Sequence, residues 1–177
     1  MKKKALALVL ALTLLVAGVV GGTLAWLTDQ TAEVKNTFTV GDINIGLTET
    51  TADYKMVPGN TIAKDPTVTV KANSEACWLF VQVTESTSLK DFITYAIAEG
   101  WTALPGVDGV YYREVPASAA DQTFSVLKGD AVTVKSDVTR TMLETAKTDA
   151  PTLTFQAYAI QKDHFATADA AWAEVSK

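Results

Sequence analysis

The feature that most limits the possible folds is a two-residue alternation of apolar and polar side chains, which recurs in short segments over most of the chain. Residues 67–71, for example, read Thr-Val-Thr-Val-Lys, and residues 43–47 read Ile-Asn-Ile-Gly-Leu. Successive side chains of a β-strand point to opposite faces, so this alternation predicts strands with one buried face. The predicted strands are residues 38–40, 43–47, 67–71, 77–83, 110–115, 124–127, 131–134 and 153–161.

Residues with strong turn preferences separate these segments. Pro58 and Gly59 suit the two central positions of a turn, and residues 73–75, 104–109 and 128–130 are rich in Asn, Asp, Gly, Pro and Ser. At Gly41-Asp42 the first alternating region either continues as one strand with a break or divides into two short strands.

Residues 88–100 fit two patterns. Ile93, Tyr95 and Ile97 alternate as in a strand, whereas Phe92, Tyr95, Ala96 and Glu99 fit one face of a helix. We expect a strand in the second half, because Glu99-Gly100 before Trp101 is typical of a tight hairpin turn.

Two segments have the composition of helices. Residues 138–147 predict one or two helical turns. Near the C-terminus, Thr167 can cap a helix and Asp169 lies in its first turn, followed by an apolar stripe at Ala168, Ala171, Trp172 and Val175. About eight short strands with short helical insertions and a C-terminal helix predict an all-β fold, either an antiparallel β-sandwich or a jelly roll.

The N-terminus has the pattern of an export signal. Three lysines at positions 2–4 precede residues 5–28, which carry no charge, and small residues lie near the end of this run. A basic start, an apolar run and small residues are typical of a secretory signal peptide. We therefore expect residues 1–25 to be removed by cleavage between Ala25 and Trp26. An uncleaved membrane anchor is the alternative, because about 20 apolar residues span a bilayer.

Either outcome places the remaining single domain, residues 26–177, outside the cytoplasm, because the lysines stay inside. Removal of residues 1–25 takes away three of the 15 basic residues and none of the 20 acidic ones, which leaves a net charge of −8. A chain without a basic stripe does not favour binding to nucleic acid or to anionic lipid. We expect membrane contact only through the uncleaved precursor.

Residues that could support catalysis are scarce. Cys77 is the single cysteine, so an intrachain disulfide is impossible, and its apolar surroundings predict a buried side chain; a reactive or intermolecular thiol is the alternative. His164 is the single histidine, and the sequence contains no His-Glu-x-x-His motif and no Gly-x-Ser-x-Gly elbow. The acidic residues are scattered and form no calcium-binding loop. We expect no catalytic residue, no metal ligand and no cofactor.

Several of these motifs in order resemble the camelysin/TasA group of exported proteins from Gram-positive bacteria. The N-terminal block combines Gly22-Thr-Leu-Ala25, the following Trp-Leu-Thr-Asp, and Asn36-Thr-Phe-Thr-Val-Gly41. Weaker similarities follow in the order expected for the group, at Ile93-Thr-Tyr95, Gly100-Trp101, Val110-Tyr-Tyr112, Val126-Leu-Lys-Gly129, Phe155–Gln161 and the helix that ends near Trp172.

This resemblance implies a jelly-roll domain that is processed by a SipW-type signal peptidase. It also implies self-association into fibres of the extracellular biofilm matrix or cell surface, with other matrix components as further partners. In such fibres the mature N-terminus, here residues 26–34, would add as a strand to the sheet of the next subunit. The donor residues implied are Trp26, Leu27, Thr28, Gln30, Ala32 and Val34.

Two other functions stay open. Some members of the group are labelled metallopeptidases, so a camelysin-like cell-surface peptidase is the alternative, although the single His164 does not match a zinc-protease motif. A monomeric exported β-domain that binds an unknown ligand is the third possibility.

Overall fold

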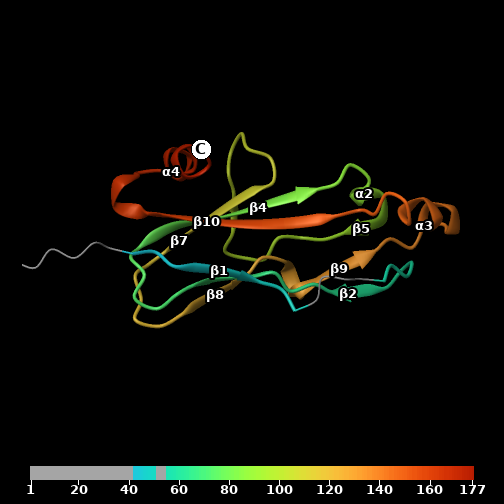
Figure 1. Ribbon diagram of the computed structural model, residues 1–177, viewed down its shortest axis with the longest axis horizontal. Helices are drawn as coiled ribbons and strands as arrows, with labels where there is room; N and C mark the ends of the chain where they lie inside the picture. Colours follow the sequence, from blue (N-terminus) through green and yellow to red (C-terminus); the bar gives the residue numbers. More distant parts are fainter. Residues whose placement is uncertain (1–41, 51–54) are drawn as a thin grey trace, which may run out of the picture. The chain divides into compact units, whose positions relative to one another are not determined.

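The computed structural model describes residues 42–50 and 55–177, and antiparallel β-strands dominate this part of the chain (Figure 1). The predicted signal peptide, the strand at 38–40 and the donor segment lie outside the described residues. The strands are β1 (Ile45–Thr48), β2 (Thr61–Ala63), β3 (Thr67–Val70), β4 (Cys77–Glu85), β5 (Ile93–Thr94), β6 (Thr102–Ala103), β7 (Val110–Val115), β8 (Gln122–Ser125), β9 (Ala131–Val134) and β10 (Leu153–Gln161). The helices are α2 (Leu89–Phe92), α3 (Arg140–Ala146) and α4 (Ala168–Val175), with 3₁₀ turns η1 (Lys128–Asp130) and η2 (Lys162–His164).

The strands form three antiparallel sheets. One has the order β10-β4-β7-β6, and the other two have the orders β1-β3-β8 and β2-β9-β5. The longest pairing joins β10 to β4 and runs from Leu153 opposite Glu85 to Gln161 opposite Cys77. The expected all-β, antiparallel fold is therefore confirmed.

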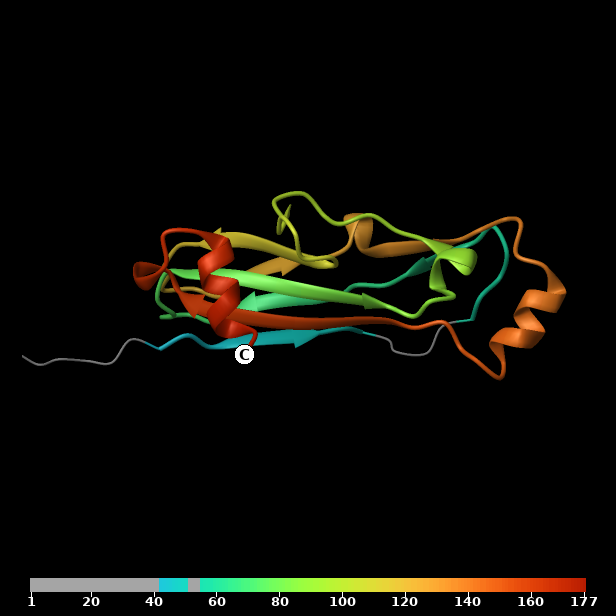
Figure 2. The same ribbon diagram turned by 90° about the horizontal axis from the view of Figure 1, so that it is seen from above.

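Backbone hydrogen bonds connect the two three-stranded sheets end to end. The amide of Val126 donates to the carbonyl of Pro66, and the amide of Lys64 donates to the carbonyl of Asp130, at 2.9 Å and 2.7 Å. Lys64 and Pro66 lie between β2 and β3, and Val126 and Asp130 lie between β8 and β9. The two bonds therefore pair the segments that connect these strands. In Figures 1 and 2, β1 and β8 continue into the region of β2 and β9 on one side of the four-stranded sheet.

The main core lies between this combined layer and the four-stranded sheet. On β3 the alternation predicted from Thr-Val-Thr-Val is observed, because Val68 and Val70 are buried while the threonines are only half-buried. Cys77, Leu79 and Val81 of β4 meet them from the opposite sheet. Burial of these branched side chains supplies most of the stabilisation that a domain without disulfides requires.

A second core lies on the outer face of the four-stranded sheet, beneath α4. Trp172 of α4 packs against Phe80 and Tyr158, with ring centroids 5.3 Å and 5.2 Å apart. Thr167 caps the helix by accepting a hydrogen bond from the amide of Ala170, as predicted. This arrangement explains why the first half of β4 is apolar on both faces.

Residues 88–100 contain both expected patterns, and the strand expected in the second half is present only in short pieces. The segment contains the helical turn α2, the two-residue strand β5 and an isolated bridge from Ile97 to Leu127. Its pairings are short and are made with β9 and with residues between β8 and β9. Gly100 occupies a turn with φ of 85°, as the sequence predicted.

Candidate functional site

The predicted cleavage and donor residues are not part of the described structure. They are Ala25, Trp26, Leu27, Thr28, Gln30, Ala32 and Val34. The described residues can therefore show only the surface on which an added strand would lie.

Strand β10 forms the longest open edge among the described strands. It lies at the end of its sheet, paired with β4 on one side and with no described strand on the other. The other end strands are shorter: β1 has four residues, β2 has three, β8 has four, and β5 and β6 have two each. Strand β10 has nine residues, enough for an extended ladder of backbone hydrogen bonds.

The sequence of β10 lacks the features that usually protect an edge. Leu-Thr-Phe-Gln-Ala-Tyr-Ala-Ile-Gln contains no charged residue, no proline and no glycine. Exposed edges in monomeric proteins are commonly blocked by lysines, prolines or bulges, because their free backbone groups otherwise pair with another chain. Strand β10 is therefore suited to accept a further strand.

A partly apolar groove, made of two hollows, lies beside the start of this edge at residues 153–155. Strand β1 lies against β10, and two hollows of about 290 Å³ and 470 Å³ open beside the N-terminal half of β10. Both are lined by Leu153 and Thr154. The smaller hollow also involves Leu47 of β1, whose side chain is 37% exposed although it is large and apolar. The larger one is lined mainly by Met56, Ile62, Leu89, Ile93, Val132 and Pro151.

An ion pair joins a residue of the larger hollow, Lys64, to a residue of the smaller one, Glu49. The ammonium of Lys64 is 2.6 Å from the carboxylate of Glu49, and its side chain is nearly buried. The same ammonium lies 5.4 Å from the centre of the Phe155 ring on β10. The pair joins a nearly buried lysine to a more exposed glutamate, and it adds charge to a groove whose lining also includes threonines.

Another basic side chain, that of Arg113, lies between aromatic rings. Its guanidinium carbon is 3.9 Å from the centre of the Phe124 ring and 5.4 Å from that of Trp101. Burial lowers the pKa of Arg113, and its Nε has no hydrogen-bond partner among the described residues. The stacking holds this cation at the core by cation–π contact.

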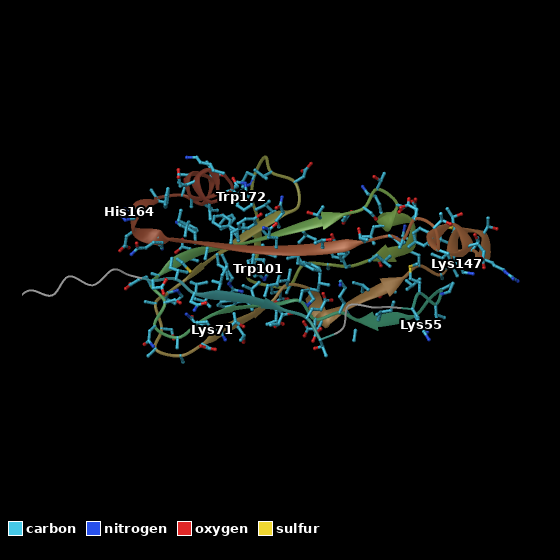
Figure 3. All side chains as sticks on the ribbon, in the orientation of Figure 1. Lys55, Lys71, Trp101, Lys147, His164 and Trp172 are labelled. Atoms are coloured by element: carbon cyan, nitrogen blue, oxygen red, sulfur yellow. The ribbon has the colours of Figure 1, made fainter. Side chains whose placement is uncertain are left out.

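His164 and Cys77, the side chains that could support catalysis, differ in their exposure. Figure 3 shows His164 at the end of the molecule, where it is exposed in η2, and Trp101 between the layers. Cys77 is fully buried as predicted, and burial raises the pKa of its thiol to about 11. Within residues 42–50 and 55–177, no group of three or more His, Cys, Asp and Glu side chains is placed to hold a metal ion.

Comparisons with known protein families, with curated proteins and with solved structures find no match to this chain. In the part of the chain that the structure describes, no helix has both the length and the apolar character needed to cross a membrane.

Sequence reasoning identified the strand at 153–161 but missed its position at an edge. The absence of charge and proline along nine residues was a usable signal, since edge strands without such residues are prone to pairing. Edge position itself depends on which strands pair, and alternation does not encode that.

Proposed function

We propose that this protein is an exported structural subunit of extracellular fibres, a jelly-roll β-sandwich that assembles head to tail by strand addition. The observation that carries the proposal is the open, uncharged edge of β10 beside a partly apolar groove. The resemblance of the N-terminal motifs to the camelysin/TasA group supports the same function.

The incoming strand in this proposal is residues 26–34 of a neighbouring copy. Its backbone would pair with β10, and alternate side chains would enter the groove, with Trp26 and Leu27 as apolar anchors. Backbone hydrogen bonds would supply affinity, whereas the apolar positions and the Lys64–Glu49 pair would favour one register.

A contact between the N-terminus of one copy and the edge of the next is heterologous. Because it does not close on itself, it propagates as a filament. Cleavage after Ala25 by a SipW-type signal peptidase would free the donor segment, so that assembly would follow export.

Deletion of residues 26–34 from the mature protein tests this function. We expect the deleted form to remain folded and monomeric while the intact mature protein forms filaments, as judged by electron microscopy and sedimentation. N-terminal sequencing of the exported protein checks that the mature chain begins at Trp26. Equal polymerisation of the two forms would contradict strand addition by this segment.

No observation on the described residues favours the metallopeptidase alternative, which depends on the resemblance alone. Substitution His164→Ala checks it directly. A proteolytic activity of the exported protein that disappears in this variant would support the enzyme.

A further inference from the structure

A further hollow lies beside Glu85 at the end of β4, and it shares Leu89 and Ile93 with the larger hollow of the groove. Its volume is about 520 Å³, and it is bounded by α2, by residues 93–97 and by the side chain of Tyr111 on β7. On the sheet the two linings differ: Tyr111 of β7 lines only this hollow, whereas Leu153 and Thr154 of β10 line only the groove, and β7 and β10 flank β4 on opposite sides.

The hollow combines an apolar surface with two aromatic side chains. Leu89, Ile93 and Ile97 supply aliphatic groups, while Tyr95 and Tyr111 supply phenol rings. Apolar concave sites that hold a few converging polar groups are the usual form of small-molecule sites.

The polar side chains that line this site include Thr94 and Lys90, and Glu85 supplies a carboxylate. The hydroxyl of Tyr95 donates a hydrogen bond to it at 2.5 Å. Burial, followed by this contact with Glu85, raises the pKa of Tyr95, so the phenol stays protonated as a donor at neutral pH. Tyr95 thereby orients the carboxylate without neutralising it.

Glu85 forms no ion pair with any described residue. Lys90 on α2 also lines the hollow, yet no ion pair joins it to Glu85. The Glu85 carboxylate attracts a cation by direct charge. The rings of Tyr95 and Tyr111 also line the hollow, and a cation over the face of such a ring gains further attraction.

We propose that this hollow binds an organic ammonium ion, in which a protonated or quaternary amine is joined to an apolar group. The ammonium lies near Glu85 and the tyrosine rings, and the apolar part contacts Leu89, Ile93 and Ile97. Lys90 opposes the ligand by like-charge repulsion, so it lowers the affinity. This binding does not depend on fibre assembly.

Titration of the intact mature protein with phenethylammonium, followed by NMR chemical shifts or calorimetry, tests the site. Phenethyl alcohol has nearly the same shape without the charge and serves as the matched control ligand. We expect phenethylammonium to bind at least about tenfold more tightly, and its affinity to fall as the salt concentration rises. Equal binding of the two ligands, or no binding of the ammonium at millimolar concentration, would overturn the proposal.

Three substitutions separate the roles of the lining side chains. Glu85→Gln removes the charge and is expected to weaken phenethylammonium binding about tenfold, whereas Lys90→Gln is expected to tighten it. Tyr95→Phe keeps the ring and is expected to have a smaller effect than Glu85→Gln. Because Glu85 and Lys90 are exposed, both glutamine variants should fold, which circular dichroism verifies. An unchanged affinity in Glu85→Gln would rule out the assigned carboxylate.

Discussion

At the scale of single residues, two glycines with nearly the same φ angle differ in the space that surrounds their Cα atoms. Gly109 and Gly106 have φ angles of 74° and 76°, which L-residues with a side chain rarely adopt. A Cβ atom on Gly109 would lie 2.4 Å from the carbonyl oxygen of Val83, whereas one on Gly106 would meet no atom within 4 Å. The amide of Val83 also donates to the carbonyl of Gly109 at 2.7 Å, so the close approach belongs to the strand pairing itself.

Alanine at the two positions should therefore differ in its effect on stability. Gly106→Ala incurs only the left-handed backbone strain, about 1 kcal/mol. Gly109→Ala adds a clash with backbone, and we expect a loss of about 3 kcal/mol or more in the free energy of unfolding. Urea denaturation of both variants checks this, and equal losses would show that the loop moves freely away from β4.

At the scale of secondary-structure elements, α4 covers a sheet face that would otherwise be apolar and exposed. The helix has only eight residues, too few to be stable alone in water. Its stability comes from the Thr167 cap, from buried Ala168 and Ala171, and from the contacts of Trp172 with Phe80 and Tyr158. Helix and sheet face therefore stabilise each other.

Removal of the central aromatic contact should loosen this helix. We expect Trp172→Ala to lower the free energy of unfolding by about 2 kcal/mol and to increase binding of a hydrophobic dye. Glu174→Ala on the exposed side of the same helix is the matched control, with an expected change within about 0.5 kcal/mol. A similar result for both variants would mean that α4 contributes little to covering the sheet.

At the scale of the whole molecule, the two sides of the four-stranded sheet differ. One side ends in the two-residue strand β6, and the other ends in the nine-residue strand β10 with its partly apolar groove. Short edges resist pairing with other chains and a long uncharged edge invites it. This asymmetry supports head-to-tail association over symmetric pairing through both edges.

Two exposed apolar residues allow the groove to be tested without disturbing the core. Leu47 lines the groove and is 37% exposed, whereas Val57 is 48% exposed, starts the turn at Pro58-Gly59 and lines neither hollow of the groove. We expect Leu47→Lys to raise the concentration needed for filament formation about tenfold or more, and Val57→Lys to leave it unchanged. Light scattering measures both, and circular dichroism confirms folding. Equal assembly of the two variants would exclude the groove as the acceptor.

The agreement between sequence and structure is best for three of the strands and for the C-terminal helix. Residues 110–115, 131–134 and 153–161 form strands with the predicted bounds, and Thr167 caps the predicted helix. The short strands β2 and β6 were not predicted, because two or three residues carry too little alternation to be recognised. Residues 88–100 form a helical turn and only short strand pieces, because their second half pairs with the rest of the described chain at β5 and at Ile97 alone.

The sequence by itself determined the class of the fold, the buried state of Cys77 and the position of the C-terminal helix, because side-chain periodicity and capping act over a few neighbouring residues. Only the tertiary structure decided that β10 is an edge, that a groove lies beside its start and that Glu85, Tyr95 and Tyr111 line one hollow. These features arise from pairings between segments far apart in the chain, such as β4 with β10, and local patterns do not specify which strands will meet.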